Sequence, residues 1–139
     1  MIEVPFTTNY TFSVAGTGAG PNRSYVKVDG DISGLQSLEG MLESAAPTGG
    51  PTTPVLDVTV QGTLSKTSHN AFDSEGVAGE WVTILDFADA AAVAFKDTKA
   101  AVRSATQAFG SYLRLRFNVT TAAGTATYGG NVRLLATGQ

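Results

Sequence analysis

Tyr112-Leu-Arg-Leu-Arg-Phe-Asn-Val119 carries the clearest structural signal in this chain, and Leu56-Asp-Val-Thr-Val-Gln-Gly-Thr-Leu64 repeats it. In both segments apolar residues alternate with polar ones. Successive side chains of a strand point to opposite faces, so this alternation indicates a strand with one buried and one solvated face. Such strands are typical of antiparallel sheets, whereas parallel sheets read as continuous apolar runs. The sequence therefore predicts an all-β protein, an antiparallel β-sandwich of jelly-roll-like type.

Shorter segments with strand patterns lie on both sides of these two. They are Tyr10–Val14, Tyr25–Val28, Trp81–Phe87, Val93–Lys96 and Asn131–Ala136. Several short strands separated by turn signals fit a sandwich or jelly roll. We expect Tyr112–Thr120 to pair with Asn131–Ala136 as a hairpin across Gly124. The apolar positions predict one core, lined by Leu56, Val58, Val60, Leu113, Leu115, Phe117 and Val132.

Two segments have an ambiguous pattern, and two others predict loops. Apolar residues recur at a spacing of three to four within Ser33–Ser44, which predicts one short amphipathic helix, with an irregular strand as the alternative. The Ala-rich segment Ala100–Ala108 fits either a helix or a strand. The Pro- and Gly-rich segment Ala46–Pro54 predicts a surface loop, and the polar segment Ser65–Glu80 a long one.

The first nine residues do not alternate clearly. Pro5 removes a backbone donor and restricts the residue before it, while Ile2, Val4 and Phe6 are apolar. We therefore expect an extended N-terminal arm over residues 1–9, followed by a β-sandwich domain over residues 10–139. Because an exposed apolar arm gains little alone, we expect it to contact a neighbouring subunit. The alternative is that the arm is an edge strand of the same domain.

Composition narrows the class of protein. A chain of 139 residues predicts one domain. Nine Lys and Arg against twelve Asp and Glu, without a basic run, argue against nucleic-acid binding. No apolar run approaches the ~20 residues of a membrane helix, and no signal peptide is visible. Only 15% of residues are charged. So low a charge suits a surface packed against neighbours or an ordinary Thr-rich β domain.

No set of residues forms a complete catalytic or metal site, so we expect no enzyme, no cofactor and no bound metal. The chain has no Cys, which excludes thiolate chemistry. His69, the one histidine, lies in a polar loop and is expected to be solvated, so that its replacement leaves folding unchanged. Asp29-Gly-Asp31 lacks the spacing of an EF-hand, although a loop calcium site with Asp73 or Glu75 stays open.

Two further groups of side chains have two readings each. Trp81 lies beside Glu80 and fits a core residue better than a sugar-stacking one. Arg114, Arg116 and Arg133 are expected to project from the C-terminal strands. They suit either a solvated strand face or an interface, where Arg is enriched. The candidate partner-contact residues are therefore Ile2, Val4, Phe6, Arg114, Arg116 and Arg133.

The segments also follow each other in a recognisable order. Val58-Thr-Val-Gln-Gly-Thr-Leu64 is followed by a polar loop, then by Gly79-Glu-Trp-Val-Thr-Ile-Leu85, Tyr112–Val119 and a final Asn131–Ala136 strand. Over roughly its C-terminal half, the chain thus resembles small β-sandwich proteins of tailed-phage virions, in particular head decoration (cement) proteins.

This resemblance implies a virion structural protein without enzymatic activity. Such a protein would lie on the capsid exterior after assembly in the host cytoplasm, bind the major capsid protein and stabilise the shell, as a homotrimer. It would bind neither nucleic acid nor membrane. The alternative is a glycan- or receptor-binding β-sandwich of a phage tail fibre, which an exposed Trp81 or Tyr128 beside carboxylates would favour.

Overall fold

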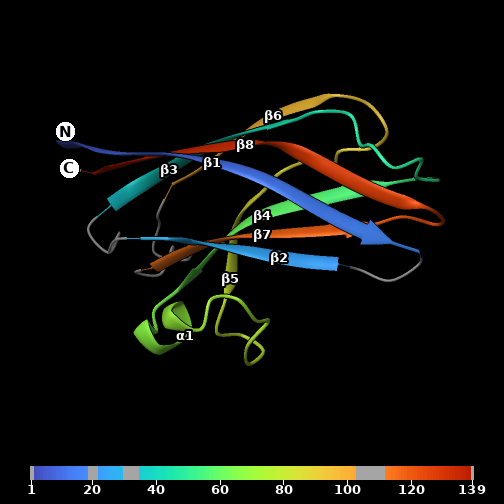
Figure 1. Cartoon of the computed structure of the whole chain (residues 1–139). Helices are drawn as coiled ribbons and strands as arrows, with labels where there is room; N and C mark the ends of the chain where they lie inside the picture. Colours follow the sequence, from blue (N-terminus) through green and yellow to red (C-terminus); the bar gives the residue numbers. More distant parts are fainter. Residues whose placement is uncertain (1, 19–21, 30–34, 103–111, 139) are drawn as a thin grey trace.

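The computed structural model describes residues 2–18, 22–29, 35–102 and 112–138, and these form two facing β-sheets (Figure 1). The side chains of residues 2–9, 35 and 138 lie outside this description. The strands are β1 (Ile2–Thr17), β2 (Asn22–Val28), β3 (Leu35–Ser44), β4 (Val55–Thr63), β5 (Val82–Asp86), β6 (Phe95–Val102), β7 (Tyr112–Thr120) and β8 (Thr125–Gly138). One short helix, α1 (Lys66–Asn70), lies between β4 and β5.

The strands follow the order of an eight-stranded jelly roll. Sheet A has the order β1-β8-β3-β6, and sheet B has the order β2-β7-β4-β5. All the pairings are antiparallel. Two four-stranded sheets connected in this way are the double-sheet arrangement of jelly rolls. The predicted all-β, jelly-roll-like sandwich is confirmed.

The core lies between the two sheets, and the predicted core residues line it. Leu56, Val58, Val60, Leu113, Leu115, Phe117 and Val132 are all at most 1% exposed. Sheet A contributes Phe12, whose ring lies 4.5 Å from that of Phe117, together with Leu38 and Leu42. The alternation in β4 and β7 therefore identified the buried face of both strands correctly.

The predicted hairpin between Tyr112–Thr120 and Asn131–Ala136 is wrong, because β7 and β8 belong to different sheets. The chain crosses from one sheet to the other just after Thr121. There the backbone N–H of Thr52 donates to the carbonyl of Ala123 over 2.9 Å, and Thr121 Oγ1 lies 3.0 Å from the carbonyl oxygen of Thr52. Gly124 has a φ of 75° at this crossing, which favours glycine. Alternation fixes a strand's buried face but not its partner.

The predicted helix over Ser33–Ser44 is also wrong, because the described part of this segment is strand β3. Leu38 and Leu42 are four residues apart, a spacing that fits one face of a helix and one face of a strand equally well. Pairing with β6 and β8 decides for the strand. Gly40 faces the core between them, where a Cβ would lie 2.9 Å from atoms of Leu85 and Phe87.

Other boundaries shift by a few residues. Strand β6 begins at Phe95 rather than Val93, and its last residues include Ala100–Val102 from the ambiguous Ala-rich segment. Residues 103–108 lie outside the described part. The loop predicted over Ser65–Glu80 contains α1 at its start. No helix in the described part of the chain is both long and apolar enough to span a membrane.

The predicted N-terminal arm has the backbone of an edge strand, which is the alternative that the sequence left open. Strand β1 runs from Ile2 to Thr17 and pairs with β8 from Phe6 onward in one register, through Thr17 opposite Thr125. The register shifts only between Ile2 and Phe6, a stretch that contains Pro5. Ile2 lies opposite Gly138, so both ends of the described chain meet at one end of sheet A (Figure 1).

Candidate functional site

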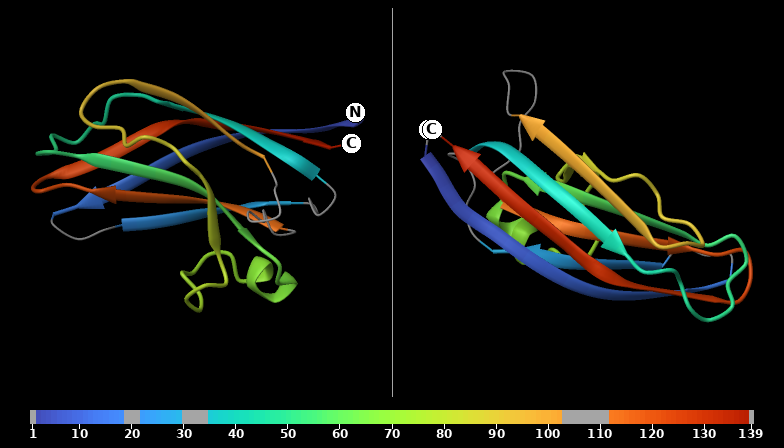
Figure 2. Two further views of the ribbon diagram at one scale, coloured as in Figure 1. Left: turned by 180° about the vertical axis from the view of Figure 1, so that it is seen from behind. Right: turned by 90° about the horizontal axis from the view of Figure 1, so that it is seen from above.

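The outer faces of the two sheets differ in what covers them. The segment of residues 65–81, which includes α1, packs over the outer face of sheet B (Figure 1). No described element covers the outer face of sheet A, which lies open above β8, β3 and β6 (Figure 2). A site that contacts another molecule is therefore to be sought on sheet A.

Arg114 anchors the covering segment to sheet B. Its Nη1 donates to the carbonyl oxygens of Phe72 (2.8 Å) and Ser74 (2.5 Å), and its Nε donates to Gln61 Oε1 (2.9 Å). The guanidinium lies between the rings of Tyr25 and Trp81, 4.4 and 4.1 Å from their centroids. Arg114 is fully buried, so the first of its two readings, a side chain on a solvated strand face, is wrong. The covering segment fills the space that the sequence pattern assigned to water.

An ion cluster holds the outer edge of the same segment. Glu75 Oε1 accepts from Arg116 Nη2 over 2.8 Å and lies 2.9 Å from Arg23 Nε. Burial favours the neutral acid, but the hydrogen bonds from Arg116, together with the nearby Tyr25 hydroxyl, lower the pKa of Glu75 below its usual value. Burial, followed by the nearby Glu75 charge, raises the pKa of Tyr25. Arg116 is therefore committed to its own loop, which leaves it little part in contacting a partner.

His69 is buried rather than solvated, so that expectation is also wrong. It is 1% exposed, and its Nε2 lies 2.9 Å from the carbonyl oxygen of Val28. A carbonyl only accepts, so Nε2 carries the proton in this arrangement. The ring stacks on Tyr112 at 4.9 Å between centroids. His69 thus fixes α1 on the end of sheet B, and its contacts are structural.

Replacing His69 with alanine is expected to lower the free energy of unfolding by about 1–3 kcal/mol, because the buried Val28 carbonyl would lose its hydrogen-bond donor. Chemical denaturation monitored by circular dichroism measures the loss. The matched control is replacement of Asn70, which is exposed next along α1, with alanine. This surface change should cost less than about 0.5 kcal/mol. Equal stability of the His69 variant and the wild type would show that neither the hydrogen bond nor the packing of the ring stabilises the fold.

The arrangement expected of a glycan site is absent from the described residues. Tyr128 is fully buried, and its hydroxyl donates to the carbonyl of Ala91 over 2.8 Å. Trp81 lies outside the core between the sheets, so the core reading is wrong, and one ring face stacks on Arg114. The neighbouring Glu80 accepts a hydrogen bond from Ser68 over 2.5 Å. Trp81 and Glu80 are thus engaged within the covering segment and its anchor, and Tyr128 is engaged in the core.

The open loop calcium reading gains no support from the geometry. Asp29 is exposed, and Asp31 lies outside the described residues. Among the residues that the structure describes, no group of three His, Cys, Asp or Glu side chains could hold a metal ion. The absence of a bound metal remains an expectation.

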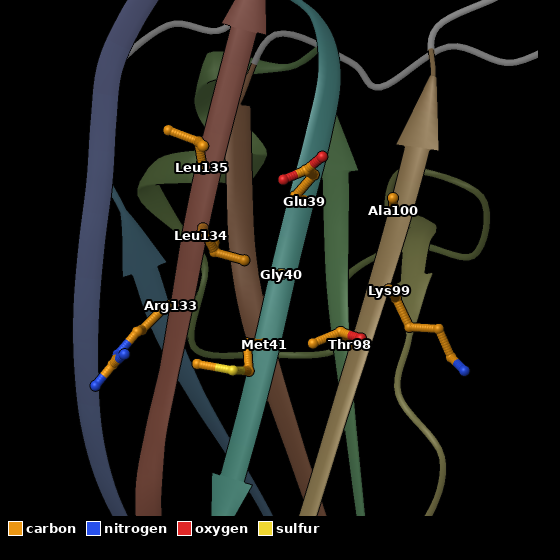
Figure 3. Close-up of a pocket in the computed structure, with 9 residues that line it drawn as sticks. All are labelled: Glu39, Gly40, Met41, Thr98, Lys99, Ala100, Arg133, Leu134 and Leu135. Carbon is orange, nitrogen blue, oxygen red and sulfur yellow. The ribbon is translucent and has the colours of Figure 1, made fainter.

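The open face of sheet A contains a shallow hollow of about 490 Å³ (Figure 3). The outward-facing side chains around it come from three neighbouring strands: Glu39 and Met41 from β3, Arg133 and Leu135 from β8, and Thr98 and Ala100 from β6. They are brought together by register, since Glu39 pairs with Leu135 and Met41 with Arg133. These four residues form a square on the sheet. Met41 and Leu135 lie on its apolar diagonal, and the oppositely charged Glu39 and Arg133 lie on the other.

The hollow combines apolar side chains with two charged ones. Glu39 and Arg133 have no ion-pair partner among the described residues. Met and Arg are enriched at protein interfaces, where apolar contacts are combined with fixed polar ones. We take the hollow as the candidate contact site.

One of the six predicted contact residues lies at this hollow. Arg133 is exposed at its rim, whereas Arg114 is buried and Arg116 is paired with Glu75. The side chains of Ile2, Val4 and Phe6 lie outside the description, so their role stays a prediction. Sequence reasoning missed Glu39 and Met41, because it assigned their segment to a helix. Reading the same segment as a strand would have placed both on the face opposite Leu38 and Leu42.

Comparisons with known proteins support the fold alone. No protein-family model matches the chain, and no curated protein matches it. A structure of infectious bursal disease virus, Gx strain, matches with a TM-score of 0.50 and 14% identity over 96% of this chain. This chain spans 32% of that chain, about a third of its length. At this identity the likeness shows a shared β-sandwich architecture.

Two other solved structures show weaker similarity. The CBM22-1 and GH10 modules of Clostridium thermocellum xylanase 10B match with a TM-score of 0.43 and 14% identity, over 99% of this chain and 27% of that one. A structure of Broad bean stain virus matches with a TM-score of 0.35 and 10% identity, over 95% and 89%. Neither is close enough to bear on function.

Proposed function

We propose that this chain is a virion structural protein that decorates and stabilises a phage capsid by binding the assembled shell of its major capsid protein. The observation that supports it is the unequal covering of the sandwich. The outer face of sheet B is covered by a segment that Arg114 anchors, whereas the outer face of sheet A is open. The hollow on this open face contains Met41, Leu135 and Arg133. Arg133 has no ion-pair partner among the described residues. Jelly rolls of this architecture occur in viral capsid domains and in lectins.

Mass action explains how such a protein would stabilise a shell. A molecule that binds only the assembled shell lowers its free energy by RT ln(1 + [L]/Kd). An interface of standard size buries about 800 Å² on each partner. Copies that bridge adjacent shell subunits would add multivalency. On this proposal the protein lies on the capsid exterior, is assembled in the host cytoplasm, and acts by binding rather than by catalysis.

The hollow provides the test of this role. The Met41→Asp substitution places a carboxylate beside Glu39 at the centre of the proposed interface. The affinity of this variant for particles that lack the protein should be lower than that of the wild type by about tenfold or more. The readout is occupancy on purified particles after titration with purified protein. Val77→Asp is the matched control, because Val77 is exposed on the covering segment of sheet B. Its occupancy should equal that of the wild type.

Two results would contradict the proposal. One is unchanged occupancy of the folded Met41→Asp variant, which would remove the hollow from the interface. The other is the location of the protein on tail fibres rather than heads in labelled particles. That location would favour the alternative, a glycan- or receptor-binding module, and glycan arrays would then identify its ligand.

A further inference from the structure

The four edge strands of the sandwich differ in how they are protected from pairing with other strands. An edge strand presents unpaired backbone N–H and C=O groups, and proteins block it with charges, proline, bulges or short length. Strand β6 carries Lys96, Asp97 and Lys99, and β2 carries Arg23 and Lys27. Strand β5 is only five residues long. Each of these three edges has a feature that discourages pairing.

Strand β1 is the exception. Between Phe6 and Gly16 it has no charged residue and no proline, and its pairing with β8 shows no register shift over this stretch. Glu3, Pro5 and the register shift all lie before Phe6. Strand β1 forms the outer border of sheet A (Figure 2), and no described strand pairs with its free side. The longest edge of the molecule is thus its least protected one.

We propose that β1 pairs with β1 of a second copy of this chain, in antiparallel orientation, to form a two-fold dimer with one continuous eight-stranded sheet. The protection of the other edges points to a second copy of β1 as the partner strand. A partner strand must also lack protection, and among the described strands only β1 meets that condition. Antiparallel self-pairing is isologous and closes with two copies. This inference does not rest on the virion role.

The faces of the strand restrict the register of this pairing. Directly opposed residues point to the same side of a sheet, and Phe12 and Val14 face the core while Thr11 and Ser13 face outward. The two opposed residue numbers must therefore add to an even number. Full overlap of residues 6–16 with their own copy places Thr11 opposite Thr11 of the partner. Opposed Thr pairs on the outer face stabilise a sheet.

A charge at the two-fold axis tests the pairing. In the Thr11→Lys variant two ammonium groups would lie opposite each other, and the dimer dissociation constant should rise by about fivefold or more. Sedimentation equilibrium of the purified protein measures it. Thr83→Lys is the matched control, since Thr83 is exposed on β5, an edge strand of the other sheet, and lies outside the contact hollow. This control should dimerise like the wild type.

Single cysteines test the register, because the chain has no Cys of its own. Opposed residues have Cβ atoms about 4.5–5.5 Å apart, close to disulfide distance. Thr11→Cys should form a disulfide-linked dimer under mild oxidation. In Ser13→Cys the two thiols lie four residues apart along the strands, about 13 Å, and should stay unlinked.

The outcomes separate cleanly. A wild-type dimer that Thr11→Lys weakens and Thr11→Cys links supports the proposal. A monomer at all concentrations overturns it, as does a dimer that neither variant affects. A trimer, which the phage resemblance implies, also overturns it, because a three-fold ring requires head-to-tail contacts. Failure of particle binding would leave this result unchanged, since the assay uses the purified protein alone.

Discussion

Replacing Leu115 with alanine is expected to lower the free energy of unfolding by about 2–5 kcal/mol. Leu115 lies at the middle of β7, opposite Val26 on one side and Val60 on the other, and is fully buried. The variant would lose the burial of the leucine side chain and leave a cavity between the two sheets. The sheets cannot easily close this cavity, because the hydrogen bonds within each sheet fix the positions of its strands. Denaturant unfolding followed by circular dichroism and tryptophan fluorescence measures the loss.

Leu64→Ala provides the matched control for Leu115→Ala. Leu64 follows the end of β4 and is 77% exposed. The same chemical change at this position should therefore alter stability by less than about 0.5 kcal/mol. If Leu115→Ala cost less than about 1 kcal/mol, the buried face assigned to β7 would be wrong. Equal losses at the two positions would lead to the same conclusion.

Replacing Arg114 with alanine is expected to cost about 3 kcal/mol or more, and to release the segment of residues 65–81. The change leaves three partly buried acceptors without this donor, and an acceptor left unsatisfied inside a protein costs about 1–3 kcal/mol. These acceptors are Gln61 Oε1 and the carbonyls of Phe72 and Ser74. Tyr25 and Trp81 also lose the cation between their rings. Hydrogen exchange should rise first in residues 65–81, while β4 and β7 stay protected.

Arg116→Ala is the control for this second effect. Arg116 lies two residues further along the same face of β7, but its partner Glu75 is exposed. Ion pairs near the surface contribute about 0–1 kcal/mol, so this variant should lose much less stability than Arg114→Ala. Equal losses for the two arginines would show that net positive charge, rather than the buried contacts of Arg114, holds the segment.

The position of Arg114 shows where sequence reasoning stops. Alternation placed Arg114 on the face of β7 opposite Leu113 and Leu115, and this is where it lies. Alternation cannot tell whether water or another segment covers that face. The answer depends on the segment of residues 65–81, more than thirty positions away in the sequence, whose carbonyls meet the guanidinium only after folding.

The contact hollow could not be predicted from the sequence for a related reason. Its side chains come from β3, β6 and β8, which are far apart in the sequence and neighbours only through sheet register. Leu38 and Leu42 have a spacing that a helix and a strand share, so local pattern assigned Glu39 and Met41 to the wrong element. Of the residues at the hollow, only Arg133 could be recognised as a candidate, from its place in a strongly alternating strand.

The amino-acid sequence alone determined the all-β class, the strands with clear alternation and the seven core residues that these strands contribute. It could do so because burial of one strand face imposes a local period of two, which is visible without knowing the partner. Tertiary structure alone decided that β7 and β8 belong to different sheets, that β1 forms an edge, and that one outer face is covered while the other is open. These features depend on hydrogen bonds between distant segments, and such pairing leaves no local trace in the order of residues.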